Sequence, residues 1–180
     1  MTMHAELTKD DIDFIHAQEV FFVATAPLSE HGHINCSPKG LRDTLYVPDL
    51  HHIAYLDLTG SGSETIAHLR ENGRVTLMFC SFSGVPKTLR IYGSGQPLLP
   101  GGSRFESLIT KFPQRGGARA IILITVKGIA SSCGYGVPMA PQMRERDRLE
   151  NWIAAKGEEG LRNYRKRFNA RSIDGLPSIP

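Results

Sequence analysis

The chain has 180 residues, of which 41% are hydrophobic and 22% charged, as in an ordinary single globular domain. These values exclude a disordered, collagen-like or coiled-coil chain, and no apolar run approaches the roughly 20 residues that cross a bilayer. The net charge of +3 arises at one end: residues 1–143 hold 12 basic and 12 acidic side chains, residues 144–171 hold 9 basic and 5 acidic ones, and Asp174 is the one remaining acid.

The first third of the chain predicts one helix followed by short strands. Thr8 can cap a helix with Asp11 at its third position, and Leu7 precedes it as part of a hydrophobic staple. β-like runs bounded by turn residues follow at 20–26, 33–37, 44–47 and 51–57.

The rest of the chain predicts further helices among longer strands. One helix should begin at Ser63 and end near Asn72. Ser103 and Glu106 have the spacing of a capping box for the next helix. In the C-terminal region, Gly157 divides two apolar stripes of helical spacing. Strands are expected at 74–82, 87–98 and 120–132.

These elements do not alternate as in a βαβ protein. The pattern favours a mainly β or α+β fold with a mostly antiparallel sheet, closed or partly closed into a barrel. Closure would remove the exposed edges that so many short strands otherwise leave. We expect one body, residues 1–143, and a helical extension, residues 144–180, that packs on the same domain or on a dimer partner.

A glycine-rich segment between a strand and a helix is the first candidate for chemistry. Thr59-Gly60-Ser61-Gly62-Ser63 offers backbone N–H groups, hydroxyls and a helix N-terminus, which together suit a phosphate group. No Gly-Lys-Ser/Thr follows, so the segment is not a Walker A loop and triphosphate hydrolysis is not indicated. The alternative is a plain connection with Ser63 as the helix cap.

Two cations are further candidates for binding an anion. The motif Ser37-Pro38-Lys39-Gly40 places a lysine in a turn at a strand end. Arg90 stands on the polar face of the strand expected at 87–98. The alternatives are a surface turn lysine and a solvated arginine on an outer face.

Other chemistries have less support. His31, His33 and Cys36 lack a second Cys/His cluster at zinc-like spacing, so no metal site is expected. No Ser/His/Asp arrangement or nucleophile elbow is present, which argues against hydrolase chemistry. The basic extension could contact nucleic acid, but its charges alternate in sign over 144–148, as on a solvated helix, so that role is not favoured.

The sequence also bears on the compartment. Residues 1–13 are polar and acidic, without the pattern of a signal peptide. Cys36, Cys80 and Cys133 are widely spaced and odd in number, which disfavours a disulfide framework. We expect a cytoplasmic protein that contacts no membrane.

Five segments, taken in order, resemble one known family. With them the chain is similar to the pyridoxamine 5′-phosphate oxidase-like FMN-binding split-barrel proteins, and more narrowly to a branch that carries the Ser-Pro-Lys-Gly motif. The segments are 34–40 (INCSPKG), 55–65 (YLDLTGSGSET), 89–93 (LRIYG), 133–138 (CGYGVP) and 169–177 (NARSIDGLP).

The resemblance implies an antiparallel split β-barrel of Greek-key type with flanking helices, and a homodimer with FMN at the subunit interface. In that family the segment matching 59–65 lies by the flavin phosphate, the segment matching 37–40 lies against the isoalloxazine ring, and the strand position of Arg90 is near the ring. The implied cofactor-binding residues are Ser37, Pro38, Lys39, Gly40, Leu58, Thr59, Gly60, Ser61, Gly62, Ser63, Thr65, Thr88 and Arg90.

The chain also departs from the vitamin B6 oxidases of that family. Ser63-Glu64-Thr65 stands where those enzymes carry Ser-Arg-Lys, so two phosphate-pairing cations are missing and a negative charge is added. Backbone N–H groups, hydroxyls and Lys39 or Arg42 would have to bind the phosphate. Residues 169–177 replace the C-terminal signature that binds pyridoxal phosphate, so vitamin B6 oxidation is not expected.

The resulting hypothesis is an FMN-dependent oxidoreductase of unidentified substrate. A cation such as Lys39 or Arg90 would stabilise the reduced, anionic flavin, while the flavin supplies the redox chemistry. Two alternatives stay open: a non-catalytic protein that binds flavin or another small ligand on the same fold, and a relative whose cofactor is a deazaflavin or haem. We expect the extension to pack over the pocket or the partner subunit and to shape substrate access.

Overall fold

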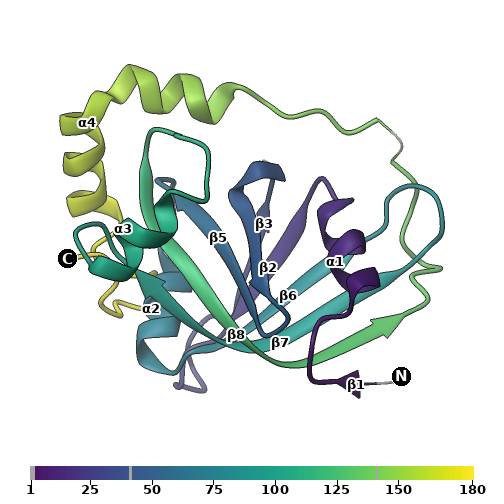
Figure 1. Cartoon of the computed structure of the whole chain (residues 1–180). Helices are drawn as coiled ribbons and strands as arrows, with labels where there is room; N and C mark the ends of the chain where they lie inside the picture. The colour runs from purple at the N-terminus through teal and green to yellow at the C-terminus, as the bar shows by residue number, and fades with distance from the viewer. Residues whose placement is uncertain (1–2, 41, 141) are drawn as a thin grey trace.

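The computed structural model describes residues 3–40, 42–140 and 142–180. Its centre is one antiparallel sheet of eight strands, in the order β3-β2-β6-β7-β8-β5-β4, with β1 paired to β8. The sheet curves on itself, and β7 and β8 sweep beneath the shorter strands (Figure 1). The strands are β1 Met3–His4, β2 Phe21–Thr25, β3 Asn35–Lys39, β4 Leu45–Asp49, β5 His52–Leu58, β6 Arg74–Cys80, β7 Thr88–Leu98 and β8 Ala118–Ser132.

Four α-helices flank the sheet: α1 Lys9–His16, α2 Glu64–Glu71, α3 Ser103–Ile109 and α4 Arg148–Phe168, with a 3-10 turn η1 at Arg42–Thr44. The cap predicted for α1 is confirmed, because the Thr8 hydroxyl accepts from the Asp11 N–H and the Asp11 carboxylate accepts from the Thr8 N–H. The capping box predicted at Ser103 is wrong. Gly102 precedes α3, and the Glu106 carboxylate instead accepts from the Gly101 N–H at 2.9 Å.

Strand β3 lies two residues later than the run expected at 33–37. It pairs with β2 so that Lys39 is opposite Phe21, and Phe21 is in turn opposite Phe79 on β6. Lys39 therefore belongs to the strand, on the core-facing side of the sheet, rather than to a turn. Pro38 is tolerated within β3 because β3 is an edge strand, which needs no N–H donor on its outer side.

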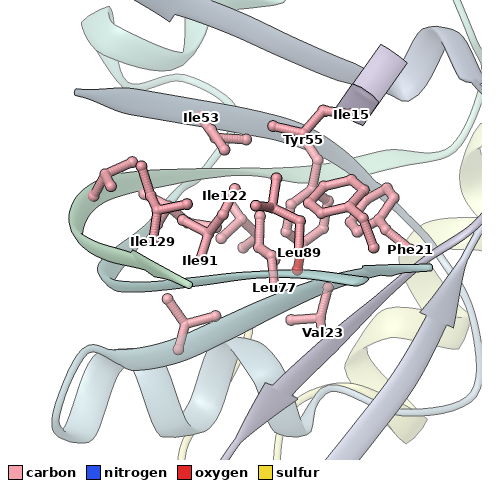
Figure 2. Close-up of a cluster of buried hydrophobic side chains, with 14 of the residues drawn as sticks. Ile15, Phe21, Val23, Ile53, Tyr55, Leu77, Leu89, Ile91, Ile122 and Ile129 are labelled. Carbon is pink, nitrogen blue, oxygen red and sulfur yellow. The ribbon is translucent and has the colours of Figure 1, made fainter. Parts of the chain in front are cut away.

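The core fills the inside of the curved sheet. Val23, Leu77, Ile91 and Ile129 are opposite one another on β2, β6, β7 and β8, and all four are fully buried. Figure 2 shows these side chains packed with other members of the same cluster. Each such aliphatic side chain contributes about 1.5–3 kcal/mol by leaving water, so the row stabilises the packing of these four strands.

The chain leaves β8 and crosses above the strands before it enters α4 (Figure 1). Gly157, at φ 63° and ψ 176°, interrupts α4, so the two predicted stripes lie on two helical segments that meet at a bend. Trp152 and Tyr164 pack edge-to-face across this bend, with ring centroids 4.9 Å apart. No helix among the described residues combines the length and hydropathy needed to cross a membrane.

Candidate functional site

A cavity of about 880 Å³ opens between the end of β3, the end of β5 and the segment that leads into α4. This volume lies in the upper part of the range of about 300–1,000 Å³ common for small-ligand sites. Eight of the predicted cofactor residues line the cavity, from two segments far apart in the sequence: Pro38, Lys39 and Gly40 from the first, and Leu58, Thr59, Gly60, Ser61 and Gly62 from the second.

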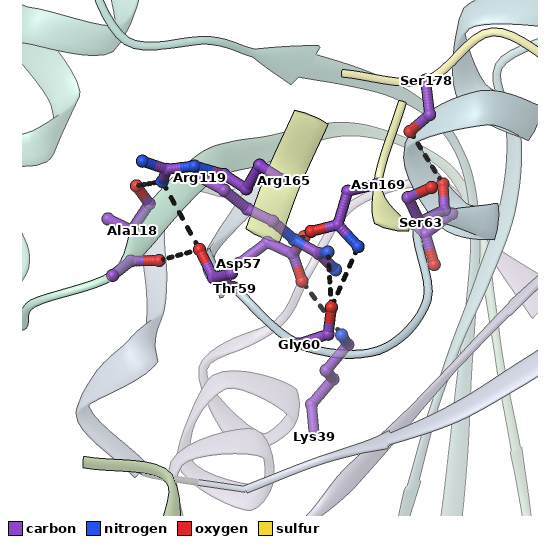
Figure 3. A network of polar contacts seen from close by, with 12 residues as sticks. Lys39, Asp57, Thr59, Gly60, Ser63, Ala118, Arg119, Arg165, Asn169 and Ser178 are labelled. Atoms are coloured by element: carbon purple, nitrogen blue, oxygen red, sulfur yellow. Dashed lines mark hydrogen bonds and ion pairs between the residues drawn. The ribbon is translucent and has the colours of Figure 1, made fainter. Parts of the chain in front are cut away.

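The polar part of the cavity wall includes an ion triad of Lys39, Asp57 and Arg119 (Figure 3). Lys39 Nζ is 3.0 Å from Asp57 Oδ1, and Arg119 Nε is 2.7 Å from Asp57 Oδ2. Burial alone would raise the pKa of Asp57, but the charges of Lys39 and Arg119 and their hydrogen bonds outweigh it and bring the pKa below its usual value. The carboxylate therefore stays ionised near neutral pH.

A β-bulge brings Arg119 to this position. Asp57 is opposite Ala120 and Leu58 is opposite Ala118, so Arg119 is an extra residue on β8 between two consecutive pairs. Such a bulge re-aims a side chain out of the regular alternation of the strand. Here it turns a guanidinium toward the carboxylate of the neighbouring strand.

The triad itself carries a net charge of +1, on a cavity wall that also contains Glu19, Glu145, Arg144 and Arg146. Two cations flank one carboxylate, and the Asp57 side chain is 1% exposed while that of Lys39 is 23% exposed. The unbalanced charge is thus accessible to a ligand through Lys39. An anion or an anionic ring that approaches it gains a charge-assisted contact in a partly desolvated place.

Three predicted hydroxyl residues do not line the cavity. The Ser63 hydroxyl donates to Arg171 O at 3.2 Å, although Ser63 does stand at the predicted start of α2. The Thr65 hydroxyl accepts from Asn35 Nδ2 at 3.0 Å, and the Ser37 hydroxyl donates to Asn35 Oδ1 at 2.8 Å. All three hydroxyls are therefore engaged within the chain.

Thr88 and Arg90 lie elsewhere on the barrel. Both are on β7, where the Thr88 and Ser132 hydroxyls are 2.5 Å apart and Arg90 Nη1 donates to Ser132 Oγ at 3.2 Å. Arg90 is opposite Met78, which places it on the sheet face away from the core-facing Leu89. Within one chain, these residues are not part of the cavity wall.

The sequence analysis missed Asp57 and Arg119, although both carry charge in the cavity. One signal was present: Asp57 is the lone charged residue of the apolar run 53–58, and Arg119 directly precedes the apolar run 120–126. Buried charges of this kind are rarely found without a partner, which would have suggested a pair. Arg42, the other predicted phosphate ligand, has a side chain outside the part of the structure that is described.

The segment before α4 forms the outer wall of the cavity. Met143, Arg144 and Arg146 line it together with Leu149 from the first turn of α4. Arg115 holds this wall to the body, because its guanidinium pairs with both Glu150 on α4 and Asp43. The extension therefore contacts the cavity of its own chain. Among the described residues, no group of three His, Cys, Asp or Glu side chains is gathered as for a metal ion.

A buried histidine, His68, lies in the polar network in which Asn35 bonds to both Thr65 and Thr25. His68 is fully buried, its Nδ1 is 2.9 Å from the Thr25 hydroxyl, and its Nε2 has no partner. Burial lowers the pKa of His68 below 6.5, against the opposing charges of Asp174, Glu64 and Glu71.

We expect the free energy of unfolding to fall as pH decreases through about 6.5, by up to about 1.4 kcal/mol per pH unit. The reason is that the unfolded chain then binds a proton on His68 that the folded chain does not. Urea titrations at several pH values measure this slope. His68→Gln should reduce it, whereas His31→Gln, at an exposed position, should not; an equal slope in both variants would contradict the assignment.

Comparisons with known proteins agree with this architecture. The family model for pyridoxamine 5′-phosphate oxidase matches residues 7–133. A protein of Aspergillus flavus, named pyridoxamine 5′-phosphate oxidase family protein ustO, is 37% identical over 196 aligned residues that cover 99% of this chain and 78% of that protein.

Solved structures show the same fold at low identity. HupZ of Group A Streptococcus superposes with a TM-score of 0.54 at 20% identity, covering 71% of this chain and 94% of HupZ. A Clostridium acetobutylicum protein described as pyridoxinephosphate oxidase family gives a TM-score of 0.51 at 13% identity, covering 69% and 92%. The predicted mainly β split barrel with flanking helices is thereby confirmed.

Proposed function

The chain belongs to the pyridoxamine 5′-phosphate oxidase family, and on that premise we propose that it is an FMN-dependent oxidoreductase whose cofactor binds in the cavity beside Lys39. The observation that carries the proposal is the positively charged wall of a cavity that also contains the glycine loop, residues 59–62. We further propose that the Ser-Pro-Lys-Gly motif, which lies at the end of β3, marks its branch of the family.

The residues present fit a flavin phosphate, but its cations would come from the strands and not from the start of α2. The start of α2 carries no cation, and the Glu64 carboxylate there already accepts from the Ile173 N–H at 3.2 Å. The charge that an anion needs is instead supplied by Lys39 and Arg119, which compensate for the missing Arg-Lys pair of the vitamin B6 oxidases. The glycine loop would add backbone N–H groups from 60–62, although the Glu64 carboxylate lies against Gly62 and the Thr59 N–H already donates to Gly117 O.

When bound, the flavin would supply two-electron redox chemistry. The chain's own part is to bind and to orient. Lys39 would place its ammonium group against negative charge, and Asp57 would hold that ammonium in place as an ionised partner. Because its pKa is lowered, Asp57 is not a proton donor near neutral pH. Met143 and Leu149 would exclude water from the outer side.

The test of the cofactor is direct. We expect the purified protein to show the absorbance of an oxidised flavin, or to bind added FMN saturably with quenching of flavin fluorescence. Absence of both would refute the proposal. Saturable FMN binding without reduction by NAD(P)H and without reoxidation by an acceptor would indicate a non-catalytic flavin protein. If a deazaflavin or haem binds more tightly than FMN, that molecule replaces FMN as the proposed cofactor.

We also propose a cytoplasmic homodimer. Phe22, Met78 and Arg90 form a half-buried row on the outer face of β2, β6 and β7, a partly apolar surface that a second copy could cover. The predicted role of Thr88 and Arg90 near the ring would require that second copy to place its cavity against this face. Light scattering should give a dimer at micromolar concentration, and a monomer would refute this.

The free state of all three cysteines is consistent with a reducing compartment.

A further inference from the structure

The C-terminal region of the chain supports the glycine loop from a side that is not part of the cavity wall. Asn169 Nδ2 donates to Gly60 O at 3.0 Å, and Arg165 Nη1 donates to Thr59 Oγ1 at 3.4 Å and to Ala118 O at 3.2 Å (Figure 3). Thr59 and Gly60 line the cavity, whereas Asn169 and Arg165 do not. The two side chains therefore contact a ligand site only through the loop.

A second set of contacts fixes the other end of the loop. The Ser178 hydroxyl donates to Ser63 O at 3.0 Å, and the Ser63 hydroxyl donates to Arg171 O at 3.2 Å. Ser63 and Ser178 are 2% and 1% exposed, so these bonds are shielded from water. The terminal segment that supplies them folds back on itself, with Arg171 bridged to Pro177.

These contacts restrict a segment that would otherwise be mobile. A loop with glycines at 60 and 62 has many accessible conformations, and binding would have to remove that freedom. Asn169 is fully buried, and its Oδ1 has no partner, which carries a desolvation penalty. An apolar residue would avoid that penalty, but it could not hold Gly60.

We propose that Asn169 and Arg165 are positioning residues that pre-organise the glycine loop for the anionic ligand of the cavity. The identity of that ligand as FMN rests on the proposed function, but the pre-organisation does not. A loop already held in its binding geometry loses less entropy on binding, so the extension raises affinity without touching the ligand. The segment 169–177, which stands in place of the C-terminal signature of the vitamin B6 oxidases, would thus support the glycine loop.

The experiment compares Asn169→Ala with Asn163→Ala, since Asn163 is an exposed asparagine on α4, the helix that Asn169 follows as its C-cap. We expect Asn169→Ala to weaken FMN binding about tenfold, because the variant loses one hydrogen bond and the order that this bond imposes on the loop. FMN affinity should be unchanged in Asn163→Ala. FMN titrations are run well below the melting temperatures of both variants, so that a loss of affinity is not confused with a loss of stability.

Amide hydrogen exchange of protein without added flavin gives the second readout. The Thr59 amide of this loop, which donates to Gly117 O at 2.8 Å, should exchange faster in Asn169→Ala, while the amides of β6 and β7 keep their wild-type rates. Unchanged exchange in the loop, or faster exchange spread over the whole barrel, would overturn the inference. If wild-type protein binds no FMN, the proposed function fails and the loop exchange alone decides this inference.

Arg165→Met provides a second variant if Asn169→Ala does not fold. It keeps the aliphatic length of the side chain but removes the donors to Thr59 and Ala118. The same faster exchange of the Thr59 amide and a similar loss of FMN affinity are expected. Wild-type values for both would overturn the proposal.

Discussion

Arg119→Met should lower the free energy of unfolding by about 3 kcal/mol, because it leaves the buried Asp57 carboxylate with one cation in place of two. For a chain of this length, such a loss corresponds to a drop in melting temperature of roughly 10 °C. Thermal and urea unfolding measure it. Methionine keeps most of the apolar stem, so the effect isolates the guanidinium.

Two comparisons sharpen this result. Arg162→Met removes an exposed arginine, whose nearest carboxylate contact to Glu158 is 3.9 Å, and should change stability by less than about 0.5 kcal/mol. The double variant Asp57→Asn/Arg119→Met should be less damaged than the sum of its single changes, because it removes the buried carboxylate together with its guanidinium and leaves only Lys39, which is 23% exposed. Additive losses would contradict the ion triad.

The pH dependence of the same variant follows from the pKa of Asp57. In the folded chain that pKa is lowered, so the triad contributes its stability above about pH 3.8 and loses it as pH falls further. Without Arg119 the pKa should rise, and the acid-induced loss should begin at a higher pH. An acid unfolding curve that keeps its midpoint would be evidence against this electrostatic role.

Lys39→Met should weaken FMN binding about 30-fold, the effect of losing one charge-assisted contact worth about 2 kcal/mol. Lys39 is the accessible cation of the triad, and Asp57 keeps Arg119 when Lys39 is removed. Equilibrium titration followed by flavin fluorescence measures the change. If reduced flavin is stabilised by this ammonium group, the midpoint potential should also fall, because the anionic form loses its counter-charge.

Lys127→Met is the matched control for Lys39, since Lys127 is an exposed lysine on β8 that does not line the cavity. It should leave FMN affinity and potential unchanged. Equal effects of the two substitutions would mean that net charge, rather than a contact at the cavity, controls binding. No effect of Lys39→Met on affinity would refute the placement of the anionic ligand beside it.

Local signals in the sequence determined several features of this protein. The cap at Thr8, the glycine segment after β5 and the break at Gly157 were predictable because each depends on residues within one or two turns of the chain. The ordered motifs led to the family and the split barrel, since a pattern spread along the chain identifies a fold even when each motif is weak. The concentration of basic residues in the extension was also evident from the sequence.

Tertiary structure alone decided the chemistry of the cavity. Lys39, Asp57 and Arg119 come from three strands, and they meet because of a strand register and a bulge that alternation of polar and apolar residues does not encode. The pairing of Asn169 with Gly60 spans 109 residues and depends on how the extension folds back. Local rules determine helix caps and turns because their energies are local, whereas a buried charge finds its partner only when distant segments pack together.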